Sequence, residues 1–320
     1  MSNNIKDAIS VHEITKTFDL TVAVDNVSFS VPKGEVVGFL GPNGSGKTTT
    51  MRMLTSFYTP DKGDIYIEGI NNLTHDVEAR SKIGYLPENN PLYGDMIVKE
   101  YLELIAKIRN VNKSKIQSNI SRAVEETGLE RVYYNQVNQC SKGYKQRVGL
   151  GAALLHEPSI LIMDEPTEGL DPNQRVPIRK LIKSLSSERT VLLSTHVLQE
   201  VEETCDRILI INKGNLVANG TISELQNVSL EQKEVEVEIS GNQIEKELSK
   251  IHNVTDVTKI SHSGEQEKFS IKYLGEEDIR PILFELCKDK NWTLWELHQI
   301  VTRLQDMFYS LTSEQTTTTE

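Results

Sequence analysis

Residues 41–49 have the composition of a loop that binds phosphate groups. They read GPNGSGKTT, which fits the pattern G-x-x-x-x-G-K-[ST] at every fixed position. Glycines let such a loop curl so that its backbone N–H groups point at phosphate oxygens, while Lys47 reaches the β- and γ-phosphates and Thr48 offers a hydroxyl to Mg²⁺. A chance glycine-rich turn is the alternative, and the apolar strand predicted at 35–40 argues against it. The predicted ATP contacts are Gly41, Pro42, Asn43, Gly44, Ser45, Gly46, Lys47, Thr48 and Thr49.

Two adjacent carboxylates follow a second apolar run, which reads SILIMDE over residues 159–165. In a parallel sheet, both Asp164 and Glu165 would emerge at the edge where the phosphate loop opens. We expect Asp164 to hold Mg²⁺ through water and Glu165 to polarise the water that attacks the γ-phosphate. An acidic pair by itself is more often a solvated strand end, so this interpretation depends on the phosphate loop.

The elements around these residues predict an α/β fold. Strand patterns at 35–40, 160–163, 191–194 and 207–211 are separated by helical segments, which implies parallel crossovers. Apolar residues recur at helical spacing within 95–110 and again from 116 to 128. We therefore predict an ATP-binding domain at 1–228 with a helical insert at about 90–155.

The pattern changes after residue 228, where Val235, Val237 and Ile239 alternate strictly with polar residues. We predict an accessory α+β domain of split βαβ type at 233–312, with dimer contacts or regulation as its role. Its elements are strand 235–239, helix 244–250, strands 254–260 and 269–273, helix 279–288, strand 292–297 and helix 302–311. The tail at 313–320 has nothing to bury and is predicted to be disordered.

Bulk composition limits the function classes. The net charge is −11, and residues 233–320 hold 17 acidic and 10 basic side chains, which disfavours a nucleic-acid partner. No apolar stretch is long enough to cross a bilayer, and the first ten residues lack a signal-peptide pattern. Three widely spaced cysteines suit a reducing compartment. These features predict a protein of the cytosol.

Residues 136–151, QVNQCSKGYKQRVGLG, resemble the signature of the ABC family of ATPases. The resemblance implies that Ser141 and Gly143 complete the γ-phosphate site of the opposite protomer. The family's leucine–serine–glycine–glycine–glutamine appears here as CSKGY, so Lys142 replaces a glycine and Tyr144 replaces an amide. The effect of these departures on the contacts to the opposite protomer is left open.

Further positions are similar to the family. Gly169-Leu170-Asp171 resembles its dimer-contacting loop, and His196 resembles the switch histidine that bridges the γ-phosphate and Glu165. Phe18 matches the aromatic residue that stacks on adenine, with core packing as the alternative. Glu88 stands where the family has a glutamine that touches Mg²⁺, and a carboxylate also ligates a hard cation.

The string YLPENNPLYGDM and the ending LQDMFYSLT resemble the drug-resistance and gliding-motility type of ATP-binding subunit. This resemblance implies an ATPase that uses ATP and Mg²⁺, dimerises head to tail and powers a separate permease, as an exporter. It also implies a peripheral location on the inner face of the membrane. The substrate stays open. The alternatives are translation-associated or chromosome-maintenance ATPases, which the single phosphate loop and the short insert disfavour.

Overall fold

The computed structural model describes residues 7–228, 233–264, 266–275, 277–300, 308 and 311–312. These residues form two compact units, one within 1–222 plus 311–320 and the other within 223–310. Each unit is described by itself. Apart from Phe308 and Leu311, the helix predicted at 302–311 lies outside the described residues, as does the whole tail predicted at 313–320. The domain boundary near 228–233 stays a prediction.

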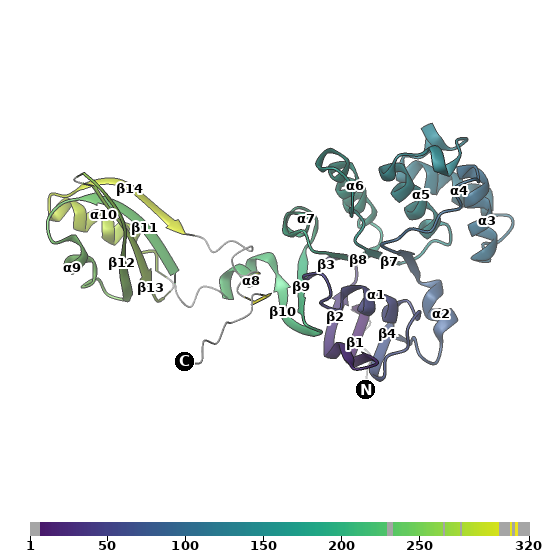
Figure 1. Ribbon diagram of the computed structural model, residues 1–320, viewed down its shortest axis with the longest axis horizontal. Helices are drawn as coiled ribbons and strands as arrows, with labels where there is room; N and C mark the ends of the chain where they lie inside the picture. Colours follow the sequence, from purple (N-terminus) through teal and green to yellow (C-terminus); the bar gives the residue numbers. More distant parts are fainter. Residues whose placement is uncertain are drawn as a thin grey trace. The chain divides into compact units, whose positions relative to one another are not determined.

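The first unit is built on a six-stranded sheet with the order β10-β9-β3-β8-β7-β6 (Figure 1). Strands β9, β3, β8, β7 and β6 run parallel, and only β10 is antiparallel to its neighbour. The bounds are β3 Val36–Leu40, β6 Ile83–Leu86, β7 Ile160–Asp164, β8 Thr190–Thr195, β9 Arg207–Asn212 and β10 Asn215–Thr221. Strands β3, β7 and β8 are buried throughout, which explains the apolar sequences of β3 and of β7 up to Asp164.

A second, antiparallel sheet with the order β2-β1-β4-β5 completes the core of this unit. Its strands are β1 Asp7–Phe18, β2 Thr21–Pro32, β4 Lys62–Ile67 and β5 Ile70–Asn71. Helix α1, Lys47–Leu54, contacts β2, β7 and β8 and buries Met51, Met53 and Leu54 in the same hydrophobic cluster. The phosphate-binding loop is therefore anchored at both ends, by buried β3 and by buried α1.

The remaining helices of the first unit connect or cover the sheets. Helices α3, α4 and α5 come between β6 and β7 in the chain and pack on one another. The bounds are α2 Asp76–Ser81, α3 Val98–Ile108, α4 Ile116–Thr127, η1 Glu130–Val132, η2 Val137–Gln139, α5 Lys142–Leu154, α6 Pro172–Leu185 and α7 Leu198–Thr204. Helix α8, Ile222–Val228, begins at the last residue of 1–222 and otherwise belongs to the second unit. No helix among the described residues is both long enough and apolar enough to span a bilayer.

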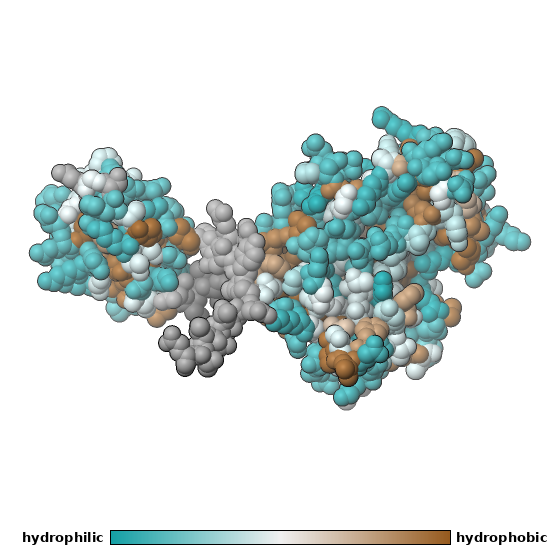
Figure 2. Space-filling model, viewed as in Figure 1, coloured by the Kyte–Doolittle hydropathy of each residue, from teal (hydrophilic) through white to brown (hydrophobic). Residues whose placement is uncertain are grey.

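The second unit is a four-stranded antiparallel sheet with the order β12-β13-β11-β14. Its elements are β11 Lys233–Ser240, α9 Ile244–Leu248, β12 Val254–Ser263, β13 Gln266–Tyr273, α10 Arg280–Asp289 and β14 Thr293–Ile300. This βαββαβ order confirms the predicted α+β fold of split βαβ type. Val235, Val237 and Ile239 are buried in its core, and Figure 2 shows that hydrophilic residues cover most of the visible face of each unit.

Candidate functional site

The loop between β3 and α1 requires glycine at two positions with left-handed backbone conformation. Gly44 has φ 78° and Gly46 has φ 109°. A Cβ atom on Gly46 would lie 2.5 Å from the carbonyl oxygen of Ala23, whereas one on Gly44 would meet nothing within 4 Å. The tight turn lets α1 begin at Lys47, so that the N-terminus of this helix faces the loop.

The side chain of Lys47 is buried beneath this loop. Its Nζ donates to the carbonyl oxygens of Gly41 and Pro42 at 2.9 and 3.2 Å. It also forms an ion pair with Glu165, at 3.3 Å from Oε1, and both side chains are more than nine-tenths buried. This ion pair joins the loop to the residue that follows β7. It offsets the cost of burying two charged groups.

Asp164 ends β7 and is almost fully buried. Its Oδ1 accepts hydrogen bonds from Ser194 Oγ at 2.5 Å and from Thr48 Oγ1 at 3.3 Å. Its Oδ2 has no hydrogen-bond partner among the described residues. Burial raises the pKa of the Asp164 carboxyl, with the charge of Glu165 adding to the rise and the two hydroxyls and Lys47 opposing it. A buried carboxylate oxygen without a partner suits a hard cation.

Glu165 takes a left-handed backbone conformation, with φ 48°. Its N–H donates to the carbonyl oxygen and to Oγ of Ser194, at 3.2 and 3.0 Å, which holds the turn in place. Its Oε2 lies 3.0 Å from Nδ1 of His196, which follows β8. The unusual conformation of a non-glycine residue, fixed from the neighbouring strand, is typical of functional positions.

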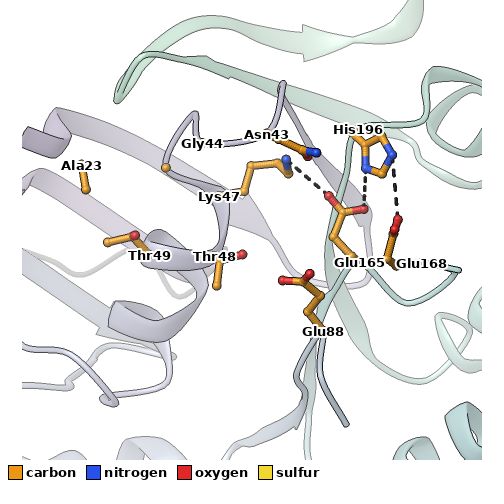
Figure 3. A pocket seen from close by; sticks show the side chains of 11 residues that line it. Ala23, Asn43, Gly44, Lys47, Thr48, Thr49, Glu88, Glu165, Glu168 and His196 are labelled. Carbon is orange, nitrogen blue, oxygen red and sulfur yellow. Dashed lines mark hydrogen bonds and ion pairs between the residues drawn. The ribbon is translucent and has the colours of Figure 1, made fainter.

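The side chains of Lys47, Glu165 and His196 converge on one cavity of ≈ 350 Å³ (Figure 3). The residues that line it are Ala23, Asn43, Gly44, Gly46, Lys47, Thr48, Thr49, Glu88, Glu165, Glu168 and His196. The cavity therefore brings together predicted residues from the phosphate loop, the end of β7, the segment after β6 and the segment after β8. Its mixture of loop amides, one lysine and several carboxylates can bind a polyphosphate and a cation and can activate water.

Seven predicted residues are not among those that line this cavity: Phe18, Gly41, Pro42, Ser45, Ser141, Gly143 and Asp164. Three of them, Phe18, Ser141 and Gly143, have other contacts. The ring of Phe18 packs edge-on against Tyr58, with 5.2 Å between the ring centroids, and Lys16 Nζ lies 5.5 Å from the Phe18 centroid. Ser141 caps α5 by accepting a hydrogen bond from the Tyr144 N–H at 3.4 Å, and Gly143 lies beside Gln174. Their roles toward nucleotide stay predictions.

Sequence reasoning missed Ala23, Glu168 and Ser194. Glu168 lies within DEPTEGLD, three residues after Glu165, and this short spacing is the signal that could have predicted it. Ser194 lies two residues before His196 on a strand, and only the pairing of β7 with β8 brings it to Asp164. Ala23 lies on β2, and nothing in its residue type signals a site.

Comparison with known proteins identifies the family. A family model described as ABC transporter matches residues 24–168. YhcH of Bacillus subtilis, an uncharacterized ABC transporter ATP-binding protein, is 35% identical over 97% of this chain and 97% of its own length. This chain belongs to the ABC transporter family of ATP-binding proteins. The bacitracin transport ATP-binding protein BcrA of Enterococcus faecalis is 36% identical over 78% of this chain and 80% of its own length.

Solved structures show the same fold in ABC cassettes. The dimeric structure of MJ0796, described as a bacterial ABC transporter cassette, is 28% identical with a TM-score of 0.60 and covers 67% of this chain and 98% of that one. The family and fold predictions are confirmed, and so is the prediction of an ATP-hydrolysing subunit that powers a separate membrane permease.

Proposed function

We propose that two copies of this ABC subunit, or one copy and a homologous subunit, close head to tail around two ATP molecules and drive an exporter. The observation that carries the proposal is the convergence of Lys47, Thr48, Glu88, Glu165 and His196 on one cavity beside the phosphate loop. The names of similar proteins, which include bacitracin transport and linearmycin resistance, support outward transport of a toxic compound.

The triphosphate binds at the loop and the N-terminus of α1. The backbone N–H groups of the loop and the positive end of the helix face the phosphate oxygens. The ammonium of Lys47 pairs with Glu165 at 3.3 Å in the structure, and it exchanges this partner for the β- and γ-phosphates when ATP binds. This exchange leaves the Glu165 carboxylate without its lysine partner and available to a water molecule.

Mg²⁺ fits the oxygen-rich side of the cavity. Asp164 offers a buried Oδ2 that has no hydrogen-bond partner among the described residues, Thr48 offers its hydroxyl, and Glu88 lines the same cavity. Oxygen atoms of this kind are the ligands that magnesium prefers. When bound, the ion neutralises charge on the triphosphate.

Glu165 and His196 carry out the water chemistry. Glu165 accepts a proton from the attacking water, because its carboxylate lies at the mouth of the phosphate loop and is held by the backbone of β7 and by Ser194. His196, 3.0 Å from the same carboxylate, orients it and contacts the γ-phosphate. A positioned base of this kind contributes roughly 10²–10⁴ in rate.

Ser141 and Gly143 act on the nucleotide of the other protomer. They lie at the N-terminus of α5, a helix of 13 residues whose cap is the Ser141 side chain. They do not line the cavity of their own chain, which agrees with a role in the opposite site. Phe18 contacts adenine. The subunit works at the inner face of the membrane through its permease and needs no nucleic acid.

ATP hydrolysis by the purified Lys47→Ala variant tests this function. The variant loses the one lysine that lines the cavity among the described residues. Hydrolysis should therefore fall to background, and ATP affinity should fall by roughly 10- to 150-fold, the range for a hydrogen bond to a charged group. Lys246→Ala, an exposed lysine on α9, is the control and should behave as wild type. Wild-type turnover in Lys47→Ala would disprove the site.

A further inference from the structure

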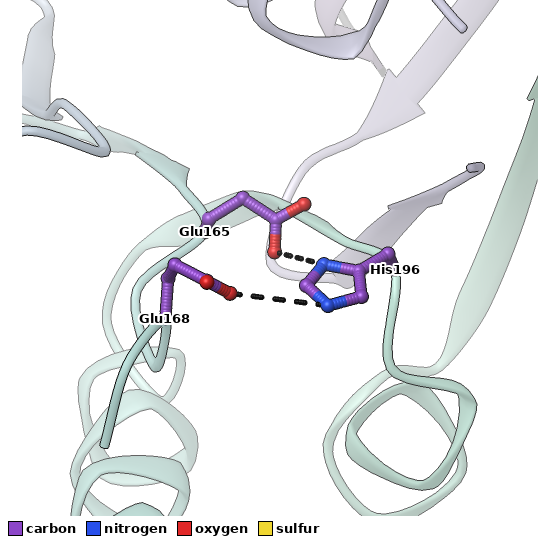
Figure 4. A group of neighbouring side chains, drawn as sticks. All are labelled: Glu165, Glu168 and His196. Atoms are coloured by element: carbon purple, nitrogen blue, oxygen red, sulfur yellow. Dashed lines mark hydrogen bonds and ion pairs between the residues drawn. The ribbon is translucent and has the colours of Figure 1, made fainter. Parts of the chain in front are cut away.

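Glu165, Glu168 and His196 form a compact group of metal-ligating side chains (Figure 4). One ligand atom from each residue lies within 4.8 Å of the others. Glu165 follows β7, Glu168 lies in the next turn and His196 follows β8, so two neighbouring strands of the sheet fix the group. Among the described residues, no other set of three His, Cys, Asp or Glu side chains meets this spacing.

We propose that these three residues bind a divalent transition-metal ion, with Zn²⁺ as the best match, at a position separate from the oxygen ligands of Mg²⁺. This site goes beyond the proposed ATPase function. Imidazole is a preferred ligand of zinc and its neighbours in the series, whereas Mg²⁺ prefers oxygen ligands alone. One imidazole and two carboxylates leave a fourth position for water, the pattern of an open zinc site.

The spacing fits zinc after small side-chain movements. Zinc binds nitrogen and carboxylate oxygen at about 2.0–2.2 Å, so ligand atoms around a tetrahedral ion lie roughly 3.3–3.6 Å apart. One ion takes a single imidazole nitrogen. In the structure, His196 Nδ1 lies 3.0 Å from Glu165 Oε2, whereas Glu168 Oε2 lies 3.8 Å from the other nitrogen, Nε2, so His196 or Glu168 has to rotate before both carboxylates reach the same ion. The side chains of His196 and Glu168 are 37% and 47% exposed, so both can rotate toward an ion.

The surrounding charges and contacts favour a cation. Two carboxylates face the imidazole, and Lys47 pairs with Oε1 of Glu165, so Oε2 stays directed at His196. The Ser194 hydroxyl and carbonyl hold the Glu165 backbone N–H, and this support outside the ligand set fixes the least mobile of the three ligands. A neutral imidazole carries one N–H and so cannot donate to both carboxylates, whereas a metal ion can join all three groups.

A bound ion would engage the two side chains assigned to water activation. If Glu165 and His196 have the roles proposed above, zinc inhibits ATP hydrolysis while the phosphate loop still binds nucleotide. Direct zinc binding and inhibition are separate readouts. Zinc that binds at these residues without slowing hydrolysis would support the metal site and would instead remove Glu165 and His196 from the proposed catalytic roles.

The test measures zinc binding by the full chain, without nucleotide, through competition with a chromophoric chelator. Glu168→Gln should weaken the tightest zinc site by at least about tenfold, because it loses a charged ligand. Glu296→Gln is the matched control. Glu296 lies 3.8 Å from His298 in the second unit and Glu236 lies 3.4 Å from the same ring, but these three described residues do not meet the mutual spacing of Glu165, Glu168 and His196. Its zinc affinity should stay within about twofold of wild type.

X-ray absorption at the zinc edge supplies a second readout. The wild-type spectrum should show nitrogen and oxygen neighbours at about 2.0–2.2 Å with an imidazole contribution, which His196→Gln should remove. Circular dichroism checks that each variant is folded. Unchanged zinc affinity in Glu168→Gln, an equal loss in Glu296→Gln, or an imidazole signal that persists in His196→Gln would each overturn the proposal.

Discussion

Replacing Ser194 with alanine removes one hydroxyl that bonds the Asp164 carboxylate and the backbone N–H of Glu165. Ser194 Oγ donates to Asp164 Oδ1 at 2.5 Å and accepts from the Glu165 N–H at 3.0 Å, and the residue is fully buried. A hydrogen bond to a charged group contributes about 1.5–3 kcal/mol. At 2–4 °C per kcal/mol for a unit of about 200 residues, Ser194→Ala should lower the Tm by roughly 3–12 °C.

The same variant should change metal dependence. The Ser194 hydroxyl lowers the pKa of Asp164 against the effect of burial, so its loss raises this pKa further and leaves the carboxylate less well positioned. We expect the Mg²⁺ concentration for half-maximal hydrolysis to rise about tenfold or more, as for other losses of a partner to a metal ligand.

The assays are thermal unfolding without nucleotide and ATP hydrolysis across a Mg²⁺ series. Ser187→Ala is the control, because its exposed hydroxyl donates only to the carbonyl oxygen of Ser184 in the described contacts. An unchanged Tm together with unchanged magnesium dependence in Ser194→Ala would refute the reasoning.

Three further substitutions test backbone strain and buried charge. In Gly46→Ala the new side chain has an unfavourable φ and also clashes with the Ala23 carbonyl, whereas Gly44→Ala has only the unfavourable φ, which costs about 1–3 kcal/mol. ATP affinity and Tm should therefore fall further in Gly46→Ala than in Gly44→Ala. Equal losses in the two variants, measured by ATP binding and thermal unfolding, would argue against the close approach of Ala23. Asp164→Asn should unfold at higher urea than wild type at pH 7.5. The pKa of Asp164 is raised in the folded protein, so wild type loses stability as pH rises above about 4 and this carboxyl ionises. The stability that Asp164→Asn gains over wild type should therefore be smaller at pH 4.5 than at pH 7.5. A larger gain at pH 4.5 would contradict this pH dependence.

The sequence predicted the sheet and the loop because their signals are local. Buried parallel strands such as β3 and β7 read as unbroken apolar runs, and glycine spacing marks the loop. The strict alternation of β11 likewise predicted a half-buried strand. The expected boundaries differ by a few residues, as at β14, where the predicted strand 292–297 is observed at Thr293–Ile300.

Contacts between distant residues could not be predicted in the same way. Ser194 reaches Asp164 only through the register of β8 against β7, and the Lys47–Glu165 pair depends on side-chain rotamers. The position of Phe18 against Tyr58 shows that residue type alone does not separate packing from ligand contact. Tertiary register, rather than local pattern, decides these cases.

ATP binding and hydrolysis by purified Glu165→Gln test the central claim most directly. If Glu165 activates water while Lys47 and the loop bind phosphate, this variant should keep ATP affinity within about threefold of wild type and slow hydrolysis by roughly 10²–10⁴. Light scattering with ATP and Mg²⁺ should then show a trapped dimer, which adding Ser141→Arg should dissolve. Hydrolysis by Glu165→Gln at the wild-type rate would contradict the account.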